Sequence, residues 1–385
     1  MNIILAAGGT GGHMIPAHAL AAELTARKIG VALITDERGA RIPGLFDGVP
    51  VHILPAGRLG GGPIGWLKAA SAVIRGRRQA RALYREFNPE AVVGFGGYPA
   101  FPSLLAASAA KIPTILHEQN AVLGRVNRLL AGEAKAIATA YPDVDRLKPA
   151  YLGKVELVGN PVREAVARLG EAPLPPFDEV APLKILVTGG SQGASVLGTV
   201  VPAGLGALEP SIRHRLQVVQ QCRPDDIAAV RGAYAALKIP AELMTYIADM
   251  PAKLAEAHLI IARAGASTIA ELTAAGRPAI LVPLPSATDD HQTANAREMA
   301  KAGGARMIAQ ADFTPEALAS QIEALVHDPE ALANAAARSL SVGRPNAASD
   351  LADLVERIAG GAMPAMVGKV TAPKFAPTAI AGVSA

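Results

Sequence analysis

Two glycine-rich turns constrain the fold of this chain more than any other feature. The first reads GGTGGH at residues 8–13 and the second reads GGSQGA at residues 189–194, and each follows a short apolar run. An apolar strand, a glycine turn and a helix form the first unit of a doubly wound α/β domain. Because the two turns lie close to half the chain apart, the sequence predicts two such domains, one opened by each turn.

Length and composition agree with this prediction. The chain has 385 residues, of which 50% are hydrophobic and 18% are charged, as in an ordinary globular α/β protein with more than one domain. Its single cysteine, Cys222, excludes an internal disulfide, and we expect a reducing compartment. The N-terminus has no basic segment before the first apolar run, so we expect no signal peptide and a cytoplasmic protein.

Strands and helices are predicted to alternate along both halves, which requires parallel sheets with right-handed crossovers. Short apolar runs predict strands at residues 2–7, 31–35, 91–93, 114–117, 136–139, 155–158, 184–188, 216–220, 241–245, 259–261, 279–282 and 305–308. We place the first domain at residues 1–160 and the second at residues 161–358. Residues 359–385 show no periodicity and are predicted to form a poorly ordered tail.

The glycine turns themselves predict a ligand class. Turns of this kind bring backbone amides close to an oxyanion, and the following helix adds a partial positive charge. A diphosphate is therefore the expected ligand. No lysine follows the last glycine of either turn, which argues against ATP or GTP hydrolysis. Two alternatives stay open, namely a nicotinamide-dependent dehydrogenase in which Asp36 holds a ribose, and turns that only allow close packing.

Two further motifs lie in the second half. Residues 263–271 read RAGASTIAE and place Glu271 one turn into a predicted helix, where its carboxylate can accept hydrogen bonds from ribose hydroxyls. Thr268 and Glu271 also have the spacing of a capping box, which spacing alone favours. Residues 289–295 read DDHQTAN and follow a predicted strand, where doubly wound sheets place ligand contacts. Capping by Asp289 or Asp290 is the alternative there.

Polar residues also end a predicted strand of the first half. Residues 117–120 read HEQN, and we expect them to face the same cleft as His13 and the glycine loop at residues 94–99. His13 and Glu118 suit general-base chemistry, because imidazole titrates near neutrality and a carboxylate can orient it. The alternative is a capping or packing histidine. No histidine pair has the spacing of a zinc site, so we expect no metal.

A basic stretch runs from Trp66 to Arg85. It contains apolar residues as well as the arginines Arg75, Arg77, Arg78 and Arg81. A basic helix with an apolar face and a tryptophan near its start is typical of a membrane-surface element. The alternative is a solvated helix whose apolar stripe packs on its own sheet. No segment offers the roughly 20 uninterrupted apolar residues of a membrane span, and no nucleic-acid-binding signature occurs, so we expect no nucleic acid partner.

Taken in order, these motifs resemble the bacterial peptidoglycan N-acetylglucosaminyltransferases, which convert lipid I to lipid II. The resemblance runs from residue 2 to residue 358 and includes GGY at residues 96–98 and GNPVR at residues 159–163. It implies a GT-B fold, in which two Rossmann-like domains face a cleft. It also implies a UDP-N-acetylglucosamine donor, inverting transfer to the 4-hydroxyl of the N-acetylmuramoyl group of lipid I, and no cofactor. The tail at residues 359–385 lies outside the family pattern.

The resemblance implies roles for individual residues of this chain. His13 or Glu118 takes the proton from the acceptor hydroxyl. The residues implied to bind substrate are Thr10, Gly11, Gly12, Asn120, Arg163, Ser191, Gln192, Gly193, Ile247, Ala266, Ser267, Thr268, Glu271 and Gln292. In that set, Arg163 and Ser191 address the diphosphate, and Glu271 binds the ribose.

The same resemblance implies that the backbone of Ile247 meets the uracil and that Gln292 reads the sugar hydroxyls. The basic stretch then becomes a docking face for anionic phospholipid, with the protein peripheral on the cytoplasmic face of the inner membrane. A non-catalytic nucleotide-sugar-binding scaffold of the cell-wall machinery is the alternative function.

Overall fold

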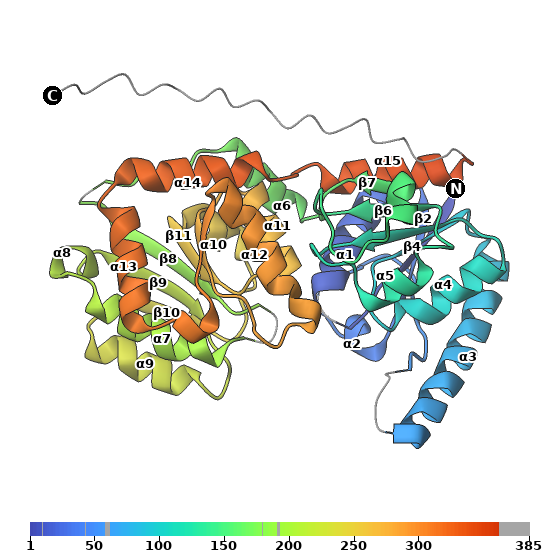
Figure 1. The fold of residues 1–385 in the computed structure, drawn as a ribbon, viewed down its shortest axis with the longest axis horizontal. Coiled ribbons are helices and arrows are strands. Elements are labelled where there is room, and N and C mark those ends of the chain that lie inside the picture. The colour runs from blue at the N-terminus through green and yellow to red at the C-terminus, as the bar shows by residue number, and fades with distance from the viewer. Residues whose placement is uncertain (10, 43, 58–61, 179, 191–192, 362–385) are drawn as a thin grey trace.

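The chain folds around two parallel β-sheets, one in each half (Figure 1). The computed structural model describes residues 1–9, 11–42, 44–57, 62–178, 180–190 and 193–361. The first sheet has the strand order β3-β2-β1-β4-β5-β6-β7 and the second has the order β10-β9-β8-β11-β12-β13. All neighbouring strands pair in parallel. Each order reverses beside the first strand of its half, so the doubly wound arrangement is confirmed.

The strands of the first sheet are β1 (Asn2–Ala6), β2 (Gly30–Thr35), β3 (Val51–Ile53), β4 (Ala91–Gly94), β5 (Thr114–Glu118), β6 (Ala136–Thr139) and β7 (Val155–Leu157). The helices of this half are α1 (Gly11–Ala26), α2 (Glu37–Ala40), α3 (Gly62–Phe87), α4 (Ala100–Ala109), α5 (Arg125–Leu130) and η1 (Pro149–Lys154). Two short helices that follow β7, α6 (Glu164–Ala167) and η2 (Arg168–Glu171), pack against the second half, where Val166 and Leu169 join its core.

The strands of the second sheet are β8 (Leu183–Thr188), β9 (Leu216–Gln221), β10 (Ala241–Met244), β11 (Leu259–Ala262), β12 (Ala279–Leu281) and β13 (Ala305–Met307). Its helices are α7 (Ser195–Ala207), α8 (Pro210–Arg213), α9 (Ile227–Ala236), α10 (Met250–Glu256), α11 (Ala266–Ala274), η3 (Thr288–Asp290), α12 (His291–Ala302), η4 (Gln310–Asp312), α13 (Pro315–Val326), α14 (Pro329–Ser341) and α15 (Ala347–Ala359).

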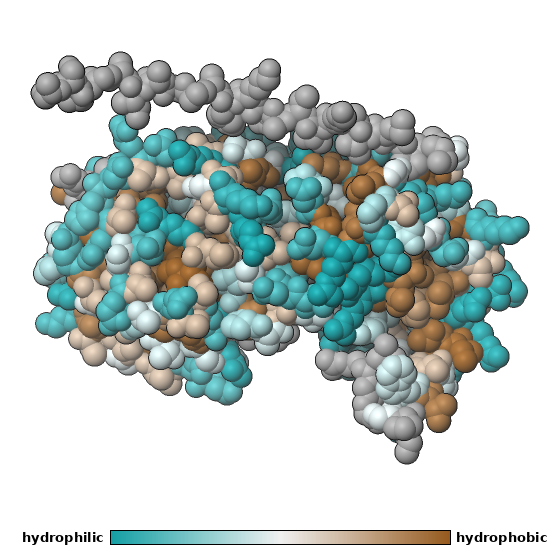
Figure 2. All heavy atoms as spheres, viewed as in Figure 1, coloured by the Kyte–Doolittle hydropathy of each residue, from teal (hydrophilic) through white to brown (hydrophobic). Residues whose placement is uncertain are grey.

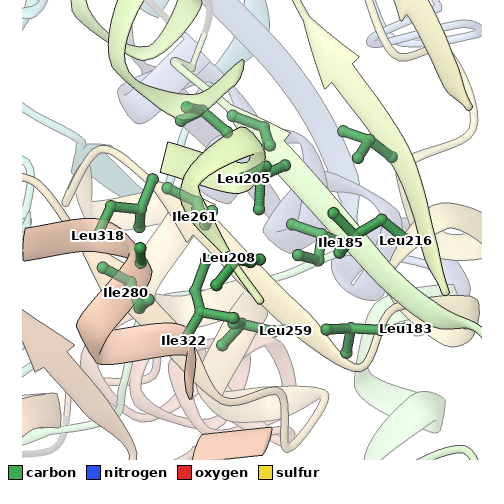
Figure 3. Close-up of a cluster of buried hydrophobic side chains, with 14 of the residues drawn as sticks. Leu183, Ile185, Leu205, Leu208, Leu216, Leu259, Ile261, Ile280, Leu318 and Ile322 are labelled. Carbon is green, nitrogen blue, oxygen red and sulfur yellow. The ribbon is translucent and has the colours of Figure 1, made fainter. Parts of the chain in front are cut away.

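Each sheet is buried on both faces, because alternate residues of its first strand enter different cores. In β1, Ile3 and Leu5 belong to one cluster of buried side chains and Ile4 belongs to another. In β8, Leu183 and its alternate neighbours enter the large core of the second half, while Leu186 faces the other side (Figure 3). Continuous apolar runs are expected for strands of this kind.

The last helix of the described residues, α15, returns to the first half. The apolar face of α15 packs into the core that contains Ile3 and Leu5, and Figure 1 places α15 beside the first sheet. Arg27, the residue after α1, holds α15, with Nη1 lying 2.8 Å from Glu356 Oε1 and 2.5 Å from Asp353 Oδ1. The predicted boundary at residue 160 stays a prediction, and the predicted tail lies outside the described residues apart from residues 359–361.

Helix α3 projects from the first half (Figure 1). Its inner face is buried at Leu83 and Tyr84, whereas Trp66, Leu67 and Ile74 keep 61%, 72% and 53% of their surfaces exposed. The arginines of the helix are exposed as well. Figure 2 shows hydrophobic surface beside hydrophilic surface on this projection. Part of the apolar stripe therefore packs on the sheet and part of it faces outward. In the described part of the chain, no helix is long and apolar enough to span a membrane.

Candidate active site

A cavity of about 350 Å³ lies where the two halves meet. Most of its wall comes from the carboxyl ends of first-half strands, namely the turns after β1 and β4 and the segment 118–127 around the end of β5. The second half contributes Thr288, Asp289 and His291. The carboxyl edge of a parallel sheet is where doubly wound folds bind ligands, so we take this cavity as the candidate active site.

The first glycine turn is held by Asp36. The carboxylate oxygen Oδ1 accepts hydrogen bonds from the backbone N–H groups of Gly9 and Gly39, both at 3.0 Å, while Arg38 Nε lies 3.0 Å from Oδ2. Burial raises the pKa of Asp36, but these donors outweigh it and the pKa is lowered overall. A Cβ at Gly8 would lie 2.5 Å from Pro99, so only glycine fits there. Asp36 thus has structural partners in place of the ribose that a dehydrogenase would require.

His13 lies in the first turn of α1, next to the glycines at the mouth of the cavity. Its ring packs against the backbone of two glycines. A Cβ atom built on Gly96 would lie 3.6 Å from His13 Nε2, and one built on Gly97 would lie 3.5 Å from His13 Nδ1. Its Nδ1 is buried and has no hydrogen-bond partner among the described residues. Burial lowers the pKa of His13, and His291 acts in the same direction, whereas the Gly8 carbonyl acts against them. The ring is therefore neutral near pH 7 and can accept a proton.

Glu118 ends β5 and is saturated with hydrogen bonds. Its Oε1 accepts from the backbone N–H and the side-chain Nδ2 of Asn120, at 3.1 and 3.2 Å. Its Oε2 accepts from Gly124 N at 2.7 Å and from Asn127 Nδ2 at 2.9 Å. Burial raises the pKa of the carboxyl, although the four donors favour its charged form. The carboxylate thus shapes the loop that follows β5.

The prediction that all four residues at 117–120 face the cleft is wrong for His117. This side chain is fully buried, and its Nε2 lies 2.9 Å from the Gly159 carbonyl oxygen. Gln119 Nε2 lies 3.0 Å from its Nδ1 and also donates to the Phe95 carbonyl oxygen at 3.0 Å. Burial lowers the pKa of His117 to about 4. Successive residues of a strand point to opposite faces, so a histidine next to Glu118 enters the core.

Asn120 joins the two halves. Its Oδ1 accepts a hydrogen bond from Asn295 Nδ2 of α12 at 3.1 Å. The fully buried Asn295 also accepts from Ala121 N at 2.8 Å and donates to the Ala264 carbonyl oxygen at 3.2 Å. The sequence predicted ligand contacts for the motif at residues 289–295, to which Asn295 belongs, but gave no signal that this side chain is buried against the first half.

The second glycine turn is braced by its neighbouring strand. Gln221 at the end of β9 donates to the Gly190 carbonyl oxygen at 3.0 Å, and Gly190 N donates to Thr188 Oγ1 at 3.3 Å. Gly193 has a φ of +66°, and a Cβ there would lie 2.7 Å from Arg223 Cγ. Glycine is therefore required on both grounds. Ser191 and Gln192, like Thr10 of the first turn, lie outside the described residues.

The helix after this turn, α7, begins without a side-chain cap, because Ala194 stands at its N-cap. Its first backbone N–H groups are thus left for an anion. Arg223 lies beside them, with Nη1 donating to Ser195 Oγ at 3.1 Å. Sequence reasoning missed Arg223. The available signal was a basic residue just beyond the predicted strand at residues 216–220.

Glu271 and Arg163 form a pair. Arg163 Nη2 lies 3.0 Å from Glu271 Oε1, while Arg163 Nε and Ser267 Oγ are buried without a partner among the described residues. Burial raises the pKa of Glu271, and the guanidinium acts against this. The capping box favoured by spacing is wrong, because α11 begins after Gly265 and has no side-chain cap, which leaves Thr268 inside the helix.

Gln292 is oriented by backbone donors. Its Oε1 accepts hydrogen bonds from Ala264 N at 3.2 Å and from Leu284 N at 3.0 Å. These two contacts fix the amide so that its nitrogen, a double donor, points away from them. Capping by Asp289 or Asp290 is also wrong, since α12 has no side-chain cap hydrogen bond.

The remaining predicted residues lie near these groups. Ile247 is 5% exposed and shares a core with Ile269 and Leu272 of α11. Ala266 is the first residue of α11, and Gly11 and Gly12 are the first residues of α1. Within the described residues, no three His, Cys, Asp or Glu side chains gather as a metal site.

Comparisons of the chain with known proteins all point to the same protein family. The model of the glycosyltransferase family 28 N-terminal domain matches residues 3–139, and that of the C-terminal domain matches residues 184–358. The chain is 62% identical to the UDP-N-acetylglucosamine–N-acetylmuramyl-(pentapeptide) pyrophosphoryl-undecaprenol N-acetylglucosamine transferase of Erythrobacter litoralis, over 94% of this chain and 91% of that protein.

The protein of the same name from Novosphingobium aromaticivorans is also 62% identical, over 95% of this chain and 94% of the relative. Among solved structures, the chain is similar to Acinetobacter baumannii MurG, with 30% identity and a TM-score of 0.72 over 92% of this chain and 99% of that one. Together with the two parallel sheets, this similarity confirms the predicted GT-B fold.

Proposed function

The chain belongs to glycosyltransferase family 28, and we propose that it transfers N-acetylglucosamine from its UDP ester to lipid I, N-acetylmuramyl-(pentapeptide) pyrophosphoryl-undecaprenol. Its similarity to transferases of that name over nearly the whole chain carries the proposal. The cavity between the halves supports it, because residues of both halves line one space in which a donor and an acceptor can meet.

The reaction breaks the bond between the anomeric carbon of N-acetylglucosamine and the β-phosphate oxygen. The electron pair of that bond leaves with UDP. A new bond forms from the anomeric carbon to the 4-oxygen of the acceptor, whose proton passes to a base of the protein. Attack on the face opposite to UDP inverts the anomeric configuration.

We assign the base to His13. The neutral imidazole lines the cavity beside Gly96 and Gly97, which have no side chains to cover it. Glu118 has no such freedom, because each of its oxygens already accepts two hydrogen bonds. In this proposal Glu118 is a positioning residue, and it fixes Asn120 beside the donor sugar.

The second half binds the donor. The N-terminus of α7, with Arg163 and Arg223, stabilises the negative charge that develops on departing UDP, an effect worth about 3 to 4 kcal/mol per well-placed donor in enzymes. Glu271 accepts hydrogen bonds from the ribose once Arg163 turns toward the diphosphate. The free amide nitrogen of Gln292 donates to a sugar hydroxyl.

Ile247 and the first residues of α11 complete the donor site. The backbone of Ile247 meets the uracil, while Ala266, Ser267 and Thr268 lie under the nucleotide. The buried Ser267 hydroxyl has no partner among the described residues, and burying such a group is costly unless a ligand satisfies it.

The acceptor is a lipid, so the protein must reach a membrane. Helix α3 presents exposed Trp66, Leu67 and Ile74 among exposed arginines, a combination that binds anionic lipid surfaces. We propose that this helix docks the first half on the cytoplasmic face of the inner membrane. The docking helix and most of the cavity wall then belong to the same half.

Membrane docking can be tested with anionic vesicles and charge-neutral variants. Three glutamine substitutions are made on α3, at Arg77, Arg78 and Arg81. The matched control neutralises three exposed residues of the second half, Arg231, Lys238 and Lys301. Each charge lost near the surface should weaken binding by about 1 kcal/mol, so the α3 variant loses far more affinity than the control. Equal affinity of both variants would overturn the docking assignment.

The transfer itself is tested by mass spectrometry of a short-chain lipid I analogue incubated with UDP-N-acetylglucosamine. A β-linked product establishes the inverting transferase. Absence of product, with the protein still stabilised by UDP, would favour a nucleotide-sugar-binding scaffold. The dehydrogenase alternative predicts thermal protection by NADH instead, and the structural role of Asp36 argues against it.

A further inference from the structure

One segment of the second half crosses to the first. Between β12 and α12, Asp289 reaches two arginines of the first half. Its Oδ2 lies 2.7 Å from Arg128 Nη2 on α5, and its Oδ1 lies 2.9 Å from Arg146 Nη1. The Asp289 side chain is 15% exposed and that of Arg128 is 26% exposed. Both oxygens of one carboxylate are thus engaged across the boundary between the halves.

The backbone of this segment is strained. Asp289 has a φ of +57° and Asp290 a φ of +52°, so two consecutive non-glycine residues are left-handed. Such residues cost free energy and persist only where surrounding contacts hold them. Asp is among the few types that tolerate the conformation. The two ion pairs of Asp289 supply contacts of this kind.

The segment also forms part of the cavity wall. Thr288, Asp289 and His291 line the same space as His13 and Asn120. The ring of His291 is close enough to His13 to lower its pKa. The position of this segment therefore sets the position of the donor-binding half relative to His13.

Two contacts near the start of α12 hold the halves together. One is the buried Asn295 contact to Asn120 and Ala121, and the other is the Asp289 contact to Arg128 and Arg146. Gln292, the residue assigned to the donor sugar, lies between them in sequence. Anchors on both sides of Gln292 fix its distance from the first half.

We propose that Asp289 is a positioning residue for glycosyl transfer, which it serves by clamping the segment before α12 onto Arg128 and Arg146. The clamp aligns the donor sugar with the acceptor hydroxyl. This proposal rests on the proposed function, but the clamp itself can be measured without transfer.

The decisive variant is Asp289→Asn, which keeps the size of the side chain and its tolerance for a left-handed backbone while removing the charge. Its matched control is Glu298→Gln, which removes an ion pair to Lys301 on the same helix that does not cross to the first half. Misplacement of a substrate by about 1 Å can cost about 100-fold in rate. We expect Asp289→Asn to lower kcat about tenfold and Glu298→Gln to leave it unchanged.

Two readouts separate positioning from general damage. UDP binding, measured by calorimetry, should stay the same in both variants, since the nucleotide contacts lie elsewhere in the second half. Combining Asp289→Asn with Arg128→Gln should cost less than the sum of the single losses, because both remove the same pair. An unchanged kcat in Asp289→Asn, or full additivity, would overturn the proposal.

Distance measurements test the clamp independently of activity. Nitroxide labels at the exposed residues Lys135 and Ala324 report the separation of the halves. Asp289→Asn should broaden their distance distribution, and Glu298→Gln should not. If wild-type protein shows no transfer but the broadening occurs, the proposed function fails and the clamp stands. If the distribution does not change, the clamp is refuted whatever the transfer assay gives.

Discussion

Two buried glutamates, one in each half, have opposite surroundings. Glu118 accepts four hydrogen bonds from groups of its own loop, whereas Glu271 pairs with the single guanidinium of Arg163. Burial raises the pKa of both. A carboxylate that already accepts four hydrogen bonds has no capacity left for a ligand, while one with a single side-chain partner can exchange that partner for a ligand. In the proposed function, the first half therefore supplies a pre-formed reaction geometry and the second half supplies a recognition surface.

Among the substitutions that test this comparison, we expect the largest effect from replacing His13. We predict that His13→Gln lowers kcat by about 10²–10⁴-fold, the usual contribution of a general base, and leaves the Kd for UDP unchanged. Single-turnover kinetics with a lipid I analogue and UDP calorimetry measure the two quantities. An equal loss of UDP affinity would contradict the division between reaction and recognition.

The pH profile of wild-type protein refines this prediction. Burial lowers the pKa of His13 below its ordinary value of 6.5. At pH 6.5 and above, the ring is therefore neutral and able to accept a proton. We expect kcat to decline only below pH 6.5, as His13 becomes protonated. A decline that begins above pH 6.5 would point to a different base.

Replacing Glu118 tests how much its four hydrogen bonds contribute to stability. Glu118→Ala leaves four donors without their acceptor, and unsatisfied buried groups cost about 1 to 3 kcal/mol each before relaxation and water entry. We expect the free energy of unfolding to drop by about 3 kcal/mol in urea titrations. The control is Glu271→Ala, which leaves only Arg163 unpaired and should cost under about 1 kcal/mol. Similar losses in both variants would remove the contrast between the two glutamates.

The sequence predicts the parts of this molecule that depend on local pattern. All strands expected from apolar runs are present, and glycine turns open both sheets. The strand β3 was not predicted, because it has only three residues and exposes Val51 and Ile53 at the sheet edge.

Residue roles that depend on long-range contacts are harder to predict. The partner of Glu271 is Arg163, which is 108 residues away, so the nearby Thr268 gave a false capping signal. The inward direction of His117 depends on the carbonyl of Gly159. Asp289 resembled a cap, yet its partners lie in the other half.

His117 allows a third test within the pre-formed half. Its folded pKa of about 4 lies below the unfolded value of 6.5. Both states are neutral above pH 6.5, and the unfolded state gains the proton first as the pH falls. Stability is therefore lost between pH 6.5 and about 4, by at most about 3 kcal/mol. We predict that His117→Gln flattens this part of the stability profile, as measured by urea unfolding at each pH. An unchanged slope would mean that His117 titrates normally.

Replacing Glu271 has the smallest expected effect of these substitutions, and that effect is specific to donor binding. Replacing it with alanine removes the proposed ribose contact but keeps α11, whose start depends on Gly265 rather than on Glu271. We predict a rise of about tenfold in KM for the donor, which corresponds to about 1.4 kcal/mol, with kcat reduced far less. A 2′-deoxyribose analogue of the donor should show a smaller difference between wild type and variant, because its missing hydroxyl already removes part of the contact. If the variant instead lowers kcat and leaves KM unchanged, Glu271 acts in the reaction rather than in recognition, and the contrast with Glu118 would have to be reversed.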